Sequence, residues 1–68
     1  MTEAELRDEL IYLINKYVSE NERELFYDDI SREGIPVKNI LANFNKVKMR
    51  TVEQVDGELI RNIYFYFC

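Results

Sequence analysis

The chain has 68 residues, of which 47% are hydrophobic and 13% aromatic, and its formal net charge is −4. A chain of this length forms one domain at most, and this apolar content is enough for one compact core. Disordered segments combine low hydrophobicity with high net charge, and this sequence does not. We therefore expect a single domain over residues 1–68.

The sequence lacks the residues that most catalytic and metal sites need. It contains no His, and its single Cys is Cys68, so His-based acid–base chemistry and Cys/His metal sites are not expected. Its only glycines, Gly34 and Gly57, are too few for a phosphate-binding loop. We expect neither enzymatic activity nor a cofactor or a bound metal.

Hydropathy and cysteine content indicate the compartment. No apolar run approaches the ~18 residues of a membrane span, and the acidic N-terminus is unlike a secretory leader. One cysteine cannot form an intramolecular disulfide, on which small secreted domains usually depend. We expect an intracellular protein, nuclear or cytoplasmic, with no membrane partner.

Charge is distributed unevenly between the two halves of the chain. Residues 1–34 hold ten acidic and four basic residues, whereas residues 35–68 hold five basic and three acidic ones. The basic half contains a short strip, Lys46-x-Lys48-x-Arg50. A net-negative domain gains little long-range attraction to nucleic acid, so RNA binding would require this strip together with stacking aromatic residues. The alternative interpretation of the strip is a solvated surface turn.

Three capping boxes predict where helices begin: Thr2-x-x-Glu5, Ser19-x-x-Glu22 and Thr51-x-x-Gln54. Apolar residues at helical spacing follow the first two and predict helices over residues 3–18 and 20–32. Gly34 is a natural stop after the second helix. Pro36 suits the first turn of a third helix, over residues 36–46.

The region 51–62 is ambiguous. Asp56-Gly57 is typical of a hairpin turn, but Val52, Val55, Leu59 and Ile60 fall on one helical face, and we favour a helix over residues 52–62. The β-branched and aromatic run 63–67 predicts a strand. The expected fold is mostly α with a small β component, like a winged helix-turn-helix domain with an incomplete wing.

One stretch resembles a known family. Residues 41–51, Leu-Ala-Asn-Phe-Asn-Lys-Val-Lys-Met-Arg-Thr, look like the segment I-A-x-F-N-R-V-K-x-L-T of the La motif, the winged-helix RNA-binding module of La and La-related proteins. Ile35-Pro36-Val37 takes the place of the family's aromatic-V-P-I, with one extra residue before the match. Lys16-Tyr17-Val18-Ser19-Glu20-Asn21 resembles Y-Y-F-S-D-x-N, with one residue fewer.

The resemblance implies binding of single-stranded RNA 3′ ends in a pocket of aromatic and polar side chains, where unpaired bases stack. The family's second Tyr corresponds to Tyr17, the Phe of the matching stretch to Phe44, and the other Phe to Tyr27 or to Phe26. The family's Gln and first Tyr are replaced by Leu13 and Lys16. The expected RNA-binding residues are Tyr17, Tyr27, Phe44, Lys46, Lys48 and Arg50.

Two other functions follow from the same fold. The apolar terminal strand favours contact with a protein partner or a second copy, through an open strand edge. The expected interface residues are Tyr64, Phe65, Tyr66 and Phe67. Sequence-specific DNA binding is disfavoured, because the helix 52–62 presents Glu53, Asp56 and Glu58, which phosphate would repel.

Overall fold

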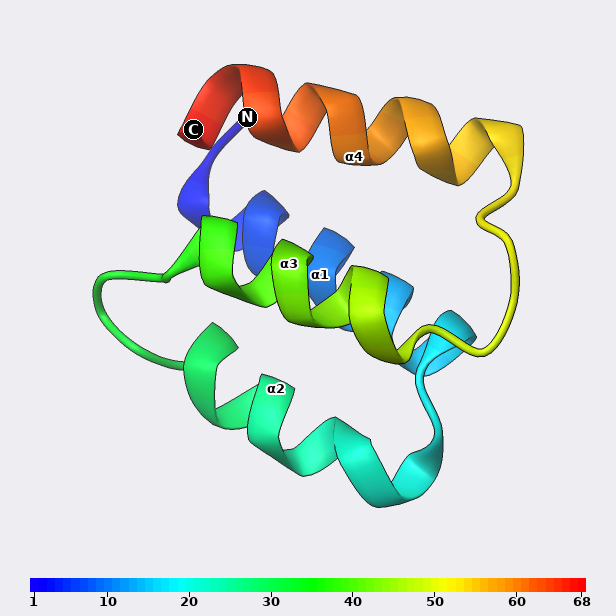
Figure 1. Cartoon of the computed structure of the whole chain (residues 1–68). Coiled ribbons are helices and arrows are strands. Elements are labelled where there is room, and N and C mark those ends of the chain that lie inside the picture. The colour runs from blue at the N-terminus through cyan, green and yellow to red at the C-terminus, as the bar shows by residue number, and fades with distance from the viewer.

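The computed structural model describes all 68 residues, and its regular structure is entirely helical. In chain order the elements are α1 (Glu3–Tyr17), a 3₁₀ turn η1 (Glu20–Glu22), α2 (Arg23–Ile30), α3 (Val37–Val47) and α4 (Gln54–Phe67). Helix α3 lies in front of α1 in Figure 1, with α4 above this pair and α2 below it. The two chain ends lie side by side, and Glu3 and Phe67 line one shallow pocket there.

Helix α1 begins at the predicted capping box. The Glu5 backbone N–H donates to Thr2 Oγ1 at 3.2 Å, and the Thr2 backbone N–H lies 3.4 Å from the Glu5 carboxylate. The helix ends at Tyr17, because Val18 adopts extended backbone angles. Arg23 donates to the carbonyl oxygens of Val18 and Asn15, which satisfies acceptors that the end of the helix leaves free. The predicted helix 3–18 is therefore confirmed to within one residue.

The predicted helix 20–32 is shorter and begins differently. The Ser19 hydroxyl donates to the Glu22 side chain and makes no hydrogen bond to the backbone, so the predicted capping box is absent. A 3₁₀ turn precedes α2, and α2 ends at Ile30, four residues before Gly34. The third predicted helix is displaced by one residue, and Pro36 precedes it as the N-cap.

The ambiguous region forms a helix and no hairpin, but the helix begins two residues later than the predicted residue 52. Helix α4 begins at Gln54, so Asp56 and Gly57 lie in its first turn and form no hairpin. The Thr51 capping box is not formed, because the N-cap is Glu53 and no side chain caps the helix there. The backbone at Gly57 has no positive φ, and a helix tolerates such a glycine at a cost of about 1 kcal/mol.

The predicted strand 63–67 and the small β component are wrong. Helix α4 continues through Phe67, and the Cys68 N–H donates to the Tyr64 carbonyl at 3.0 Å. The physical reason is packing: Ile60, Ile63 and Phe67 lie on one helical face, which buries Ile63 and packs the other two, partly buried, against the core. No second strand exists to satisfy a strand's backbone groups. The fold is thus not a winged helix, and it has no open strand edge.

The core gathers side chains from all four helices around α1. Tyr17 and Phe44 pack edge to face inside it, with ring centroids 5.8 Å apart and an interplanar angle of 88°. None of the helices has the length and apolar character of a bilayer-spanning segment. The buried apolar residues are Leu6, Leu10, Leu13, Ile14, Tyr17, Val18, Phe26, Ile30, Val37, Ile40, Leu41, Phe44 and Ile63.

Candidate functional site

A buried carboxylate joins the start of α4 to the end of α1. Asp56 is only 2% exposed, and its oxygens accept hydrogen bonds from Tyr17 Oη at 2.5 Å, Tyr12 Oη at 2.8 Å and Lys16 Nζ at 2.8 Å. Burial on its own raises the pKa of Asp56, but the three hydrogen bonds outweigh it and lower the pKa to about 2. The bond to Asp56 likewise raises the pKa of Lys16 above its ordinary value.

A second layer of contacts surrounds this carboxylate. The Glu53 backbone N–H donates to Tyr17 Oη at 3.0 Å, so this hydroxyl both accepts and donates. The Glu53 carboxylate pairs with Lys16 at 3.3 Å and with Arg50 at 3.1 Å. Every buried polar side-chain atom has a partner. The cluster therefore acts as the anchor of α4 on α1.

The sequence-based interpretation missed this anchor. Asp56 was expected on the outer face of its helix, whereas the structure buries it. The missed signal was its spacing: Asp56 lies four residues before Ile60 and seven before Ile63, which places it on the apolar face of α4.

Two of the predicted RNA-binding aromatic residues lie in the core. Tyr17 is 0% and Phe44 is 3% exposed, so neither ring offers a face on which a base could stack. The guanidinium of Arg50 lies 4.8 Å from the centre of the Tyr17 ring. Tyr27 is at the surface of α2, where its hydroxyl bonds to the Asn15 side chain.

The three cations of the predicted strip are not equivalent. Lys48 donates to the Asn45 side chain, and Arg50 pairs with Glu53. Lys46 makes no hydrogen bond or ion pair and lines a cavity beside α2. The structure does not bring these cations together with exposed aromatic rings, and RNA binding at these residues stays a prediction.

Several apolar side chains of α4 are exposed to solvent. Phe65 is 81% and Val55 75% exposed, and Tyr64 and Tyr66 are also exposed. Phe65 and Tyr66 pack edge to face, with ring centroids 5.2 Å apart. Phe67, the fourth predicted interface residue, instead packs against the core.

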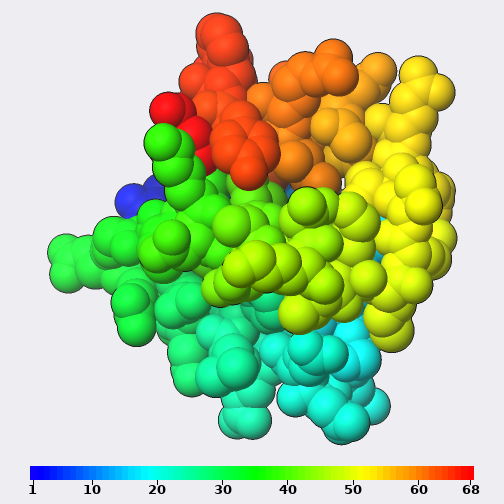
Figure 2. Space-filling view, viewed as in Figure 1, coloured from blue at the N-terminus to red at the C-terminus, as the bar shows by residue number.

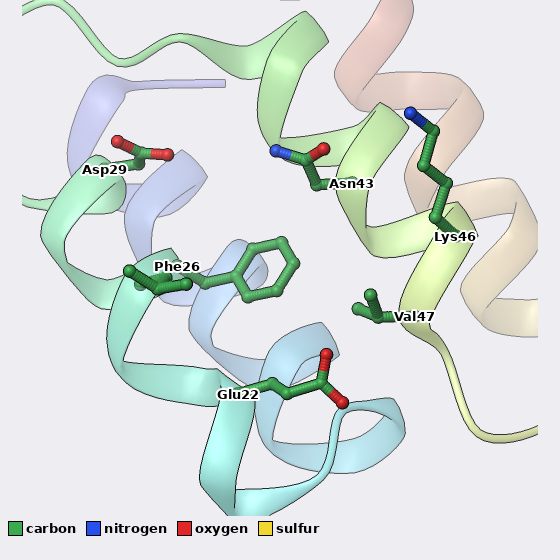
Figure 3. Close-up of a pocket in the computed structure, with 7 residues that line it drawn as sticks. Glu22, Phe26, Asp29, Asn43, Lys46 and Val47 are labelled. Carbon is green, nitrogen blue, oxygen red and sulfur yellow. The ribbon is translucent and has the colours of Figure 1, made fainter.

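Two hollows flank α3. In Figure 2, α3 lies between α4 above and α2 below. The one beside α4 has a volume of about 200 Å³ and is mostly apolar. The one beside α2 has a volume of about 280 Å³ and mixes apolar with charged side chains. Its lining residues are Glu22, Leu25, Phe26, Asp29, Asn43, Lys46 and Val47, drawn in Figure 3.

No group of three or more potential metal ligands is positioned to hold an ion. Comparison with protein-family models, curated proteins and solved structures gave no match to this chain. The functional argument therefore depends on the surfaces described above.

Proposed function

We propose that this chain is a protein-interaction module that pairs with a second copy of itself through the outer face of α4. The observation that carries the proposal is the exposure of Phe65 and Val55, 81% and 75%, on a helix whose opposite face is packed. Scattered exposed apolar residues are ordinary, but several aromatic side chains gathered on one element indicate an interface.

The order of residues along α4 suits an antiparallel pair. Val55, Glu58, Asn62 and Phe65 are separated by three, four and three residues, the spacing that keeps side chains on a two-helix seam. A two-fold axis between antiparallel helices places one end of each helix beside the other end of its partner. Phe65 of each copy then lies on Val55 of the other, and Glu58 lies opposite Asn62.

Charge on this face permits self-association despite the net charge of −4. The exposed charged side chains within α4 are Glu58 and Arg61, which balance each other, and neither forms an ion pair within the chain. In the antiparallel pair, Arg61 of one copy is one residue away from the position opposite Glu58 of the other. Two symmetric ion pairs therefore flank the seam.

The dimer is expected to be weak. A single pair of helices with polar residues at its centre lies at the small end of protein interfaces. Sedimentation equilibrium up to about 1 mM chain is the appropriate measurement, because an association of about −4 kcal/mol half-populates a dimer there. Phe65→Ser should abolish association without unfolding the domain, since Phe65 contributes little to the core.

A charge exchange tests the antiparallel arrangement itself. Glu58→Arg alone places like charges beside each other across the seam, as does Arg61→Glu alone, so each variant should be monomeric. An equimolar mixture of the two variants restores opposite charges at both ends and should form a heterodimer. Circular dichroism melting of each variant controls for damage to the monomer.

The outcomes are distinct. Association of the intact chain that neither Phe65→Ser nor the single charge reversals weaken places the contact elsewhere and contradicts the proposal. A chain that remains monomeric at about 1 mM contradicts self-association outright. A mixture that stays monomeric contradicts the antiparallel geometry.

A further inference from the structure

Three of the seven side chains that line the hollow between α2 and α3 are apolar. Phe26 and Val47 line it from the two helices, and the Phe26 ring points toward α3 in Figure 3. Leu25, on the same hollow, is 76% exposed, the highest exposure among the large aliphatic residues of the chain. At about 280 Å³ the space is below the usual range of drug-sized ligand pockets. The hollow is large enough for a single apolar side chain of a protein partner.

Two carboxylates stand at opposite ends of this hollow. Glu22 and Asp29 are seven residues apart on one face of η1 and α2, and Figure 3 shows them on either side of Phe26. Glu22 bonds only to the Ser19 hydroxyl, and Asp29 makes only a 3.5 Å surface pair with Arg32. Surface pairs of this kind contribute little, so both carboxylates can accept another cation.

Lys46 does not neutralise this acidic pair. It forms no ion pair with Glu22 or Asp29, and in Figure 3 its amine is directed away from Glu22. The first 34 residues carry six more acidic than basic residues, which adds a negative field around the hollow. The charge of the site therefore favours a cationic ligand and disfavours a phosphate backbone.

We propose that the hollow between α2 and α3 binds a short basic amphipathic helix of a protein partner. An apolar side chain of that helix enters between Phe26 and Val47, beside Leu25. Two Lys or Arg residues about seven positions apart span about 10 Å along the helix, the length of two turns, and reach Glu22 and Asp29. This surface lies on the other side of α3 from α4, so it is separate from the proposed dimer face.

The test uses a synthetic Ala-rich helical peptide as the probe. It carries one central Leu flanked by two Lys residues seven positions apart. One matched peptide has Glu in place of both Lys residues, and the other has Ala in place of the Leu. Binding to the full chain is measured by NMR titration at low salt. We expect the basic Leu peptide to shift the amide signals of α2 and α3, and both matched peptides to bind at least about fivefold more weakly.

Variants of the chain complete the test. The double neutralisation Glu22→Gln with Asp29→Asn should weaken the basic peptide about fivefold. The matched control, Asp8→Asn with Glu33→Gln, removes the same charge from two exposed acids that make no hydrogen bond or ion pair and should bind normally. The monomeric variant Glu58→Arg should also bind normally, which separates this proposal from the dimer.

Three results would overturn the proposal: no amide shifts with the basic peptide at about 1 mM, equal binding of the acidic peptide, or equal weakening in both double neutralisations. Shifts of the same α2 and α3 amides with single-stranded RNA at similar affinity would assign the hollow to nucleic acid instead.

Discussion

The Tyr17 hydroxyl donates to the Asp56 carboxylate across 2.5 Å, and this contact joins residues 39 positions apart in the chain. It fixes the first turn of α4 on the last turn of α1. Tyr12 and Lys16 bond to the same carboxylate, so Asp56 collects the polar contacts that hold α4 on α1. The loop 48–53 before α4 contains no regular structure, and the apolar contacts of α4 come from Ile63 and its partly buried neighbours. The anchor therefore determines where the exposed aromatic face of α4 lies.

Removing the carboxylate should destabilise the domain strongly. We expect Asp56→Ala to lower the free energy of unfolding by about 3 kcal/mol, because it removes the acceptor of two tyrosine hydroxyls and one of the two carboxylates that pair with Lys16. Urea denaturation followed by circular dichroism measures the change. Gln54→Ala on the exposed side of the same turn should change stability by no more than about 0.5 kcal/mol. Equal effects of the two substitutions would show that the Asp56 anchor contributes nothing to the free energy of unfolding.

The same carboxylate predicts an acid-dependent loss of stability. The pKa of Asp56 in the folded chain is about 2, below its ordinary value of 3.8. Its ionised form therefore stabilises the fold above about pH 3.8, and this contribution is lost as the pH falls through about 2. The pKa of Glu53 is lowered in the same direction, chiefly by its bond to Lys16.

Thermal unfolding at several pH values between about 2 and 5 checks this prediction, because this range includes both the folded-state and the ordinary pKa of Asp56. The variant Asp56→Asn should be less stable at pH 5 and should lose less stability on acidification than the original chain. Parallel pH profiles of the two proteins would contradict the prediction.

Gly57 offers a stabilising substitution. It lies inside α4 with an ordinary helical backbone, and a Cβ added there meets nothing within 4 Å. Alanine restricts the unfolded chain and has a higher helix propensity, so Gly57→Ala should raise the free energy of unfolding by about 0.5–1 kcal/mol. A decrease in the urea midpoint would mean that α4 does not continue through this residue.

RNA binding can be tested apart from protein association. Because Tyr17 and Phe44 are covered, we expect a uridine-rich single strand to bind weakly and to lose affinity as salt increases. The double variant Lys46→Glu with Lys48→Glu should abolish that binding. Arg50 is left unchanged in this variant, because it pairs with Glu53. Fluorescence anisotropy at two salt concentrations provides the measurement. Tight, salt-insensitive binding that survives the double reversal would contradict this expectation.

The positions of the helices could be predicted from the sequence, whereas the conformation of the C-terminal segment could not. The apolar stripe beginning at Leu6 and the Thr2 capping box locate α1 almost to the residue, since local periodicity and local hydrogen bonds determine both. The segment from Ile63 to Phe67 was misassigned because strand propensity is weak compared with burial of Ile63 and Phe67 against the core.

The candidate surfaces depend on tertiary packing that no local pattern specifies. The hollow beside α2 requires Phe26 and Val47 to face each other across two helices that are joined by a loop of six residues, 31–36. The burial of Phe44 follows from its contact with Tyr17, 27 positions earlier. A motif match at residues 41–51 cannot reveal which side of α3 faces inward.

The neighbouring positions of the two chain ends have a consequence for engineering. Both ends meet where Glu3 and Phe67 line one pocket, so a short linker can join them. The domain can therefore be inserted into a surface loop of a host protein while the two host residues on either side of the insertion stay close together. It can equally be cut open at the loop 31–36 and rejoined through its original ends as a circular permutant.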